Sequence, residues 1–309
     1  MRRPRRWVEA LAASAALIGC HRDSLQPACS MGTVTETIGG IAEPRRVFAT
    51  SDAVFWSGVD GIQRLLRGEA AATRLVDQVD PDLVAFNGRR FAWAVRADPP
   101  GAARQVLAKD VAGGPLALIA ADFRDGGLAL DEAGGAWWTT VDGSEVILWT
   151  RTTGAARQVA RVAGAAVRGL LLDAAAAYLA VDGSLLAVAR ADGAIRTVAA
   201  SLAAQIGLLA QDGSSLWLGG AGGLFQVAKS GGSPAARALG NAVAAVPDGQ
   251  RTYWIEGGPS GAVHLLTATA DTRVATDVGS PAGMAMDESR VYFGTWSGSR
   301  GSIAALCKF

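Results

Sequence analysis

The sequence predicts an all-β fold, a seven-bladed β-propeller, from three observations. First, a short motif of apolar and aromatic residues recurs seven times along the 309 residues. Second, turn-forming pairs such as Asp-Gly separate short apolar runs. Third, the last repeat is one strand short, while a β-rich segment near the N-terminus belongs to no repeat. Repeats of ~40–50 residues are typical of four-stranded propeller blades. Asp-Gly between apolar runs is a strong hairpin signal.

The seven repeats are counted from their aromatic anchors, each of which follows an Asp or Asn. The central residues of these anchors are Phe55, Ala92, Trp137, Tyr178, Trp217, Trp254 and Tyr292. They are separated by 37, 45, 41, 39, 37 and 38 residues, and the 290 residues from Cys20 onward, divided by seven, give about 41 per repeat. We expect the anchors to pack between neighbouring blades.

The fifth repeat shows the four strands expected of each blade. Its apolar runs are residues 205–210, 216–218, 224–227 and 236–239. In the fourth repeat, we expect the second turn at Asp182-Gly183 and the third turn at Asp192-Gly193. The second turn is expected at Asp60-Gly61 in the first repeat and at Asp142-Gly143 in the third. Two-residue hairpin turns need positive φ, which glycine supplies.

An acidic or amide residue follows the first strand of each repeat. These residues are Asp52, Asn87, Asp131, Asp173, Asp212, Asp248 and Asp287. Short side chains of this kind hydrogen-bond to nearby backbone N–H groups, so we expect them to cap turns. A calcium loop would place several oxygen ligands in one short segment, a pattern that the chain does not contain.

Ring closure follows from the strand count. The last repeat, from Pro281, holds three strands and ends with residues 302–307. The leftover segment, residues 33–38, alternates and is rich in β-branched residues. Pairing it as the outer strand of the last blade would leave no open seam. The propeller is therefore predicted to span residues 32–309.

The N-terminus has the pattern of a secretory signal peptide. Four arginines precede residue 7, and the apolar run of residues 10–19 is too short to span a bilayer. The run ends in Leu17-Ile18-Gly19-Cys20, which resembles the lipobox of bacterial lipoproteins. The resemblance implies lipidation of Cys20, a signal peptide at residues 1–19 and a lipid-anchored tether at residues 20–31. Because His21 rather than Asp follows Cys20, the family rule favours the outer membrane. An ordinary secreted protein is the alternative.

Cysteine parity supports the predicted ring closure. If Cys20 is lipidated, Cys29 and Cys307 remain, and an even pair in an oxidising compartment indicates a disulfide. Antiparallel pairing of the N-terminal strand with the last strand would bring these two cysteines near each other. The sequence therefore predicts a Cys29–Cys307 disulfide at the seam.

Composition excludes several kinds of site. Two histidines cannot form a three-histidine metal site, and three cysteines cannot form a four-cysteine cluster. The formal net charge is +1, and removing residues 1–19, with four arginines and one glutamate, changes it to −2. Basic residues cluster only in the first six positions, so we expect no nucleic-acid partner. No cofactor is predicted.

The chain resembles the secreted bacterial β-propeller lipoproteins that are loosely described as TolB-like or of unknown function. The residues that carry the resemblance are the lipobox and the blade phrases, most clearly residues 224–234. The WD dipeptide, the kelch glycine pairs and the tryptophan motif of quinoprotein dehydrogenases are missing. The resemblance covers nearly the whole mature chain and implies the fold rather than an activity.

No catalytic set is evident. His264 is expected to be a partly buried strand histidine, and no Gly-x-Ser-x-Gly elbow occurs. We expect a binding face in the loops, where Arg96, Arg124, Trp296 and Arg300 are of the types that anchor interfaces. The sequence thus predicts a membrane-anchored, non-catalytic scaffold for an envelope protein or glycan. The alternative is a propeller hydrolase or lyase with carboxylates and arginines at the channel mouth.

Overall fold

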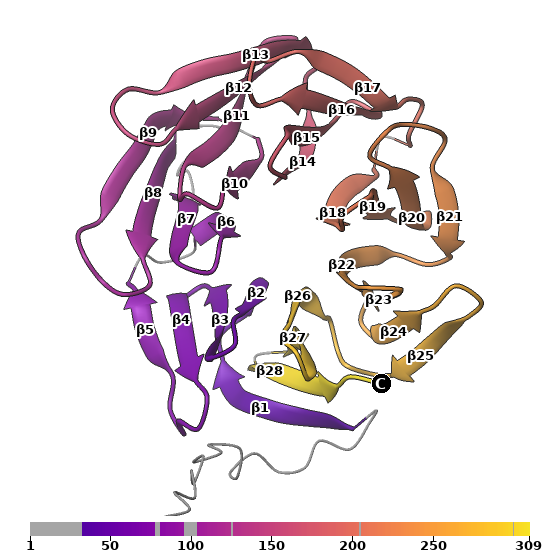
Figure 1. The fold of residues 1–309 in the computed structure, drawn as a ribbon. Helices are drawn as coiled ribbons and strands as arrows, with labels where there is room; N and C mark the ends of the chain where they lie inside the picture. The colour runs from indigo at the N-terminus through magenta and orange to yellow at the C-terminus, as the bar shows by residue number, and fades with distance from the viewer. Residues whose placement is uncertain (1–32, 78–80, 96–103, 125, 204, 299) are drawn as a thin grey trace, which may run out of the picture.

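The computed structural model describes residues 33–77, 81–95, 104–124, 126–203, 205–298 and 300–309. In these residues, 28 strands form seven four-stranded antiparallel sheets, which follow one another around a ring (Figure 1). No helix in the described part of the chain is long and apolar enough to cross a membrane. The prediction of a seven-bladed β-propeller is confirmed.

Each blade runs from an innermost first strand to an outermost fourth strand. Blade 1 comprises β2 (Arg46–Ala49), β3 (Ala53–Gly58), β4 (Gly61–Leu66) and β5 (Thr73–Val76). Blade 2 comprises β6 (Pro81–Phe86), β7 (Arg90–Val95), β8 (Arg104–Asp110) and β9 (Ala117–Phe123). Blade 3 comprises β10 (Leu128–Leu130), β11 (Ala136–Asp142), β12 (Glu145–Arg151) and β13 (Arg157–Ala163). Blade 4 comprises β14 (Val167–Leu172), β15 (Ala176–Val181), β16 (Ser184–Ala189) and β17 (Ile195–Ala199).

The remaining blades complete the circle. Blade 5 comprises β18 (Gly207–Gln211), β19 (Ser215–Gly220), β20 (Gly223–Ala228) and β21 (Ala235–Ala238). Blade 6 comprises β22 (Ala242–Asp248), β23 (Arg251–Glu256), β24 (Ala262–Leu266) and β25 (Asp271–Ala275). Blade 7 comprises β26 (Ala282–Met286), β27 (Arg290–Ser297), β28 (Arg300–Cys307) and the N-terminal β1 (Val34–Ile41).

The ring closes between the two ends of the described chain. Strand β1 pairs antiparallel with β28, with Val34 opposite Leu306 and Ile38 opposite Ile303 (Figure 1). Bulges between residues 36 and 38 and between 39 and 41 bend β1 along the blade. The predicted N-terminal closing strand is therefore confirmed, and it runs three residues beyond the predicted end.

The predicted turn at Asp182-Gly183 forms as expected. Val181 pairs with Ser184, and both turn residues have positive φ, 44° and 78°. A Cβ on Gly183 would lie 2.7 Å from the carbonyl oxygen of Leu202, so only glycine fits here.

The corresponding turns of blades 1 and 3 lie one residue away from their predicted positions. Gly58 pairs with Gly61, and Asp142 pairs with Glu145. The turn residues are therefore Val59-Asp60 and Gly143-Ser144. The cross-strand packing on each blade fixes the register, and the turn takes whichever two residues remain.

The hydrophobic core consists of seven clusters, one in each junction between blades. The 3/4 junction joins Trp137 to Leu179, and the 5/6 junction joins Trp217 to Trp254. Around blade 1, Trp56 packs with Tyr292, and Phe55 packs with Phe91. The prediction that the aromatic anchors pack between blades is confirmed. Every blade is stabilised by two neighbours, so an open ring would expose two apolar faces.

Removing β1 tests the closure. A variant that starts at Ala42 loses the partner of β28 and exposes Ile303, which is fully buried against β1 and blade 1. We expect its melting temperature, measured by circular dichroism, to fall by roughly 10 °C or more. The control variant starts at Thr33 and keeps β1. A peptide of residues 33–41 should partly restore the lost stability, whereas equal melting temperatures for the two variants would contradict the closure.

Candidate functional site

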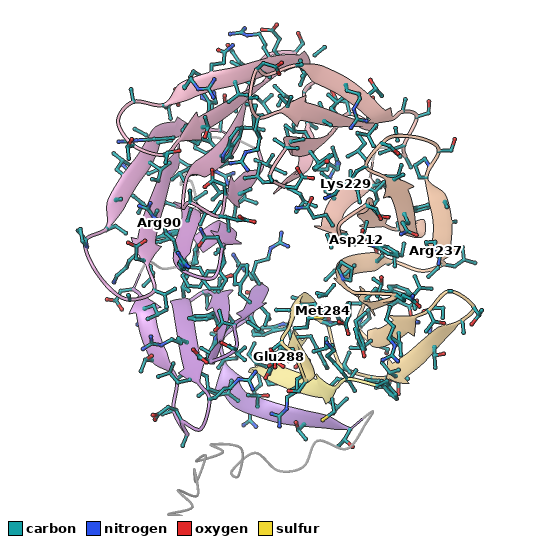
Figure 2. The ribbon with its side chains drawn as sticks, in the orientation of Figure 1. Arg90, Asp212, Lys229, Arg237, Met284 and Glu288 are labelled. Carbon is teal, nitrogen blue, oxygen red and sulfur yellow. The ribbon has the colours of Figure 1, made fainter. Side chains whose placement is uncertain are left out.

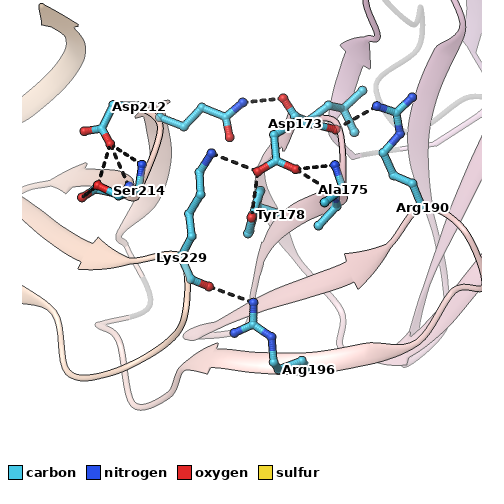
Figure 3. A network of polar contacts seen from close by, with 12 residues as sticks. Asp173, Ala175, Tyr178, Arg190, Arg196, Asp212, Ser214 and Lys229 are labelled. Atoms are coloured by element: carbon cyan, nitrogen blue, oxygen red, sulfur yellow. Dashed lines mark hydrogen bonds and ion pairs between the residues drawn. The ribbon is translucent and has the colours of Figure 1, made fainter. Parts of the chain in front are cut away.

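The turns between the first and second strands carry most of the polar side chains that sequence analysis singled out. In blade 4, one oxygen of Asp173, Oδ1, accepts hydrogen bonds from the backbone N–H groups of Ala175 and Ala176, at 2.9 and 2.8 Å. Its other oxygen, Oδ2, accepts from the hydroxyl of Tyr178 and from Nζ of Lys229, both at 2.9 Å (Figure 3). The carboxylate is thus fully occupied by structural partners.

These contacts decide the charge state of the network. Burial alone would raise the pKa of Asp173, but the hydrogen bonds from Lys229, the two backbone N–H groups and Tyr178 outweigh it and lower this pKa to about 2. Burial and the neighbouring carboxylate raise the pKa of Tyr178 to about 12. Asp173 is therefore ionised and Tyr178 neutral at physiological pH, which suits a fixed ion pair rather than proton transfer.

The same arrangement recurs between other blades. Lys229 is the first residue after the third strand of blade 5, so its ion pair with Asp173 joins two blades. We call such a pair an acid–base clasp. The other clasps are Arg190 with Asp131 at 2.8 Å, Lys308 with Asp248 at 2.8 Å, and Arg67 with Asp287. Each base follows the third strand of the blade after the one that carries the acid.

Arg190 and Lys229 also cover aromatic rings. The guanidinium carbon of Arg190 lies 5.1 Å from the ring centroid of Trp137, and Nζ of Lys229 lies 5.4 Å from that of Tyr178. Such cation–π contacts add to the attraction between blades.

Asp287 behaves like Asp173: burial raises its pKa, but hydrogen bonds from Tyr292 and two backbone N–H groups, together with the charge of Arg67, lower this pKa overall.

The turn-capping prediction is confirmed for five of the seven residues and is wrong for Asp52 and Asp248, whose carboxylates accept no backbone hydrogen bond from the described residues but contact Ser51 and Lys308 instead. Four of these side chains each accept hydrogen bonds from two backbone N–H groups within their turn, namely those of Asn87, Asp173, Asp212 and Asp287. The side chain of Asp131 accepts one such bond. In blade 1, Thr50 takes this role through Oγ1, which accepts from the N–H groups of Asp52 and Ala53. Thr50, not Asp52, lies five residues before its aromatic anchor, like Asp173 before Tyr178.

The central channel is lined mainly by aliphatic side chains of the innermost strands. Two adjoining cavities of about 470 and 450 Å³ run along it. Met284 on β26 lies at the inner rim of the ring, whereas Arg237 on β21 lies near the outer rim (Figure 2). The charged side chains among the described lining residues are Arg46 and Arg168, and no acidic residue is among them. This part of the wall offers no carboxylate pair for acid–base catalysis.

The structure places the three described residues of the predicted binding face on two different blades. Arg124 follows β9 of blade 2, where its side chain is 63% exposed and pairs with Asp122 at 3.6 Å. Trp296, half-buried, and Arg300, exposed, lie on the β27–β28 hairpin of blade 7. Blade 1 stands between these two blades, so the structure does not gather them into one patch. Arg96 lies outside the described residues.

The cysteine predictions lie at the edge of the described chain. Cys20 and Cys29 fall outside it, so their lipidation and pairing stay predictions. Cys307 ends β28, is 5% exposed, and its backbone N–H donates to the carbonyl oxygen of Thr33 at 3.4 Å. Its position at the seam agrees with the predicted strand pairing.

His264 is a buried strand residue with local partners, as expected. Its Nε2 lies 3.3 Å from Glu256 and its Nδ1 lies 3.3 Å from Asp271. The ring stacks on Trp254 with centroids 4.1 Å apart, and the indole of Trp254 donates to Asp271 at 2.9 Å. Among the described residues, no group of three or more His, Cys, Asp or Glu side chains is placed to hold a metal ion.

Sequence analysis missed a pair of tryptophans in the 2/3 junction. Trp138 lies directly opposite Trp149 on the β11–β12 hairpin, and both line a cavity of about 570 Å³ together with Arg124. No signal in the sequence marked this pair, because the predicted turn at Asp142-Gly143 would place Ile147 opposite Trp138. The observed turn at Gly143-Ser144 places Trp149 there instead. Only Trp137 was used as an anchor, and it faces the opposite junction.

Comparison with known proteins supports the fold alone. No family model and no curated protein matches the chain. The chain is similar to the solved structure of U3-55K, with 11% identity, a TM-score of 0.65 and coverage of 89% of this chain and 98% of that one. It is similar to the WD40 β-propeller domain of Doa1, with 11% identity, a TM-score of 0.65 and coverage of 88% and 96%.

A third similar structure differs in its closure. The β-propeller domain of the Trilobed protease from Pyrococcus furiosus is 11% identical, with a TM-score of 0.63 and coverage of 86% of this chain and 95% of that one. That domain is described as having an open velcro topology, whereas here β1 pairs with β28. The similarities confirm the propeller part of the predicted resemblance.

The Asp173–Lys229 clasp should contribute measurably to stability. We expect Asp173→Asn to lower the free energy of unfolding by about 1–2 kcal/mol, after allowing for solvent screening of a partly exposed pair. Lys229→Met should add little to this loss, which gives a coupling energy of about 1 kcal/mol in a double-mutant cycle by urea denaturation. Asp192→Asn, in an exposed turn of the same blade, is the control. A coupling energy near zero would contradict the clasp.

The same network should make stability depend on pH at both extremes. Because the pKa of Asp173 is lowered from 3.8 to about 2, its stabilisation is complete above about pH 4 and is lost as the pH falls toward 2. Because the pKa of Tyr178 is raised from 10.0 to about 12, its contribution is complete below about pH 10 and is lost as the pH rises toward 12. Denaturation midpoints across pH should flatten at the acid end in Asp173→Asn.

Proposed function

We propose that this chain is a lipoprotein, exported and anchored through Cys20 to the bacterial outer membrane, and that its propeller serves as a non-catalytic scaffold that binds a protein or glycan of the cell envelope. The lipobox pattern at residues 17–20 supports the anchor. The closed ring supports the scaffold, because seven packed junctions and a paired seam hold the loops of each face in fixed positions.

The observation that carries the non-catalytic part is the direction of the carboxylate pKa shifts. A general acid at neutral pH needs a raised pKa. Here the shifted carboxyl groups, Asp173, Asp212 and Asp287, all have lowered pKa values, because turn N–H groups and neighbouring side chains hold their charged forms against the effect of burial. These carboxylates bind turn N–H groups and the bases of the clasps. Their occupied hydrogen-bond sites and lowered pKa values disfavour the alternative, a hydrolase or lyase that uses such carboxylates for catalysis.

The anchor is tested by cell fractionation. Cys20→Ala removes the thiol that accepts the lipid, so we expect the protein to move from the membrane fraction to the soluble fraction and to lose incorporation of labelled palmitate. Cys29→Ala is the matched control, because it keeps the lipobox and should stay with the membrane. Unchanged sedimentation of Cys20→Ala with the membrane would refute the anchor.

The seam is tested by mass mapping of the exported protein without reduction. We expect one peptide pair that links Cys29 to Cys307, because β1 and β28 run antiparallel with Val34 opposite Leu306. In the chain-entropy model, a crosslink that closes so long a loop contributes about 4–5 kcal/mol, so reduction should lower the melting temperature. Two thiols that alkylate without reduction would refute the disulfide.

A further inference from the structure

A groove lies in the junction between blades 2 and 3. Strand β9 of blade 2 forms one wall, and strands β11 and β12 of blade 3 form the other. The cavity of about 570 Å³ arises because β9 presents the small residues Ala120 and Ala121 there, and Ala121 is exposed. Ile119 and Phe123 of the same strand are buried and belong to one hydrophobic cluster with Trp138.

Two tryptophans form the floor of this groove. The rings of Trp138 and Trp149 lie nearly parallel, with an interplanar angle of 12° and centroids 6.5 Å apart. Trp138 is 3% exposed and Trp149 is half-buried, so Trp149 presents the accessible ring. Its Nε1 donates to Oγ1 of Thr140 at 3.0 Å. This bond satisfies the polar edge of the indole and fixes the ring, which leaves its apolar face for a ligand.

Three exposed charged side chains line the groove. Asp122 and Arg124 form an ion pair at 3.6 Å and are 74% and 63% exposed, and Asp142 is exposed at the end of β11. Two carboxylates against one guanidinium give this rim a net charge of −1, which disfavours an anionic ligand. All three groups can pair with hydroxyl groups, the carboxylates as acceptors and the guanidinium as a donor.

Strand addition by a peptide is a poorer fit. Nη1 of Arg151 donates to the carbonyl oxygens of Leu118 and Ile119 at 3.0 and 2.8 Å. Two acceptors of β9 are therefore already occupied by blade 3 where a peptide strand would pair. The groove is instead a concave, aromatic-floored site with a few polar groups that converge on it, the usual form of a small-ligand site.

We propose that this groove binds a pyranose unit of a neutral glycan. A pyranose ring has an apolar C–H face, which packs on the fixed indole of Trp149, and hydroxyl groups around its edge, which reach Asp122, Arg124 and Asp142. Such a ligand uses both the aromatic floor and the polar rim, which offers hydrogen-bond acceptors and a donor. This inference rests on the proposed scaffold function and deepens it by assigning the ligand class and the site.

The test uses the full-length protein in detergent and an array of neutral, anionic and amino-sugar oligosaccharides. We expect binding to at least one neutral oligosaccharide. Trp149→Ala should weaken that binding at least tenfold, whereas Trp149→Phe, which keeps an aromatic face, should stay within about threefold. Phe225→Ala is the matched control, since it removes a half-buried aromatic side chain of blade 5, outside the groove, and it should bind like the parent protein.

A second pair of variants tests the same site in case Trp149→Ala does not fold. Asp122→Ala and Asp142→Ala change exposed side chains, and each should weaken binding about threefold or more without changing the melting temperature. The proposal is overturned if no neutral oligosaccharide binds, if only anionic or amino-sugar ligands bind, or if Trp149→Ala and both aspartate variants bind normally.

Failure of the glycan site and failure of the anchor are distinguishable. Fractionation of the same cells reports on Cys20 independently of any ligand. A membrane-attached protein that binds no neutral glycan overturns the groove alone. A soluble protein that binds one through Trp149 overturns the anchor alone.

Discussion

The pairing of β1 with β28 is the contact on which the rest of the structure depends. Every other blade is made of four consecutive strands, whereas blade 7 takes its outer strand from the opposite end of the chain. Without it, the apolar side of β28, including the fully buried Ile303, would face solvent and the junction with blade 1 would lose part of its cluster. Ile38 and Ile41 of β1 pack in the cluster between blades 7 and 1, so this pairing stabilises the junction that closes the ring.

The clasps join neighbouring blades through pairs of charged side chains. Among the described residues, an acid at the end of the first strand of one blade, or directly after it, pairs in four of the seven junctions with a base that follows the third strand of the next blade. In three of these clasps the acid, Asp131, Asp173 or Asp287, also caps its own turn and accepts from an aromatic side chain, so one carboxylate fixes a hairpin, an aromatic ring and a neighbour. Such groups are conspicuous in the sequence, and their partners show that they take part in assembly of the ring.

Local signals predicted the blades well and the candidate site only in part. Repeat spacing and turn pairs located the blades because these features depend on neighbours in the chain, while two turns shifted by one residue because strand register is set by packing across the sheet. Arg124 was found, but Trp138 and Trp149 were not. Trp296 and Arg300 were grouped with Arg124 by residue type, and the ring places blade 1 between them.

The sequence by itself determined the number of repeats, the hairpins and the need for a borrowed strand, because each is recorded in spacing and turn chemistry along the chain. Only the tertiary structure decided which face of each strand meets which neighbour. Trp137 and Trp138 are adjacent, yet they point into different junctions. The groove beside Trp138 exists because alanines of a separate blade stand opposite it, and the angle between two packed sheets is a property of neither sequence segment alone.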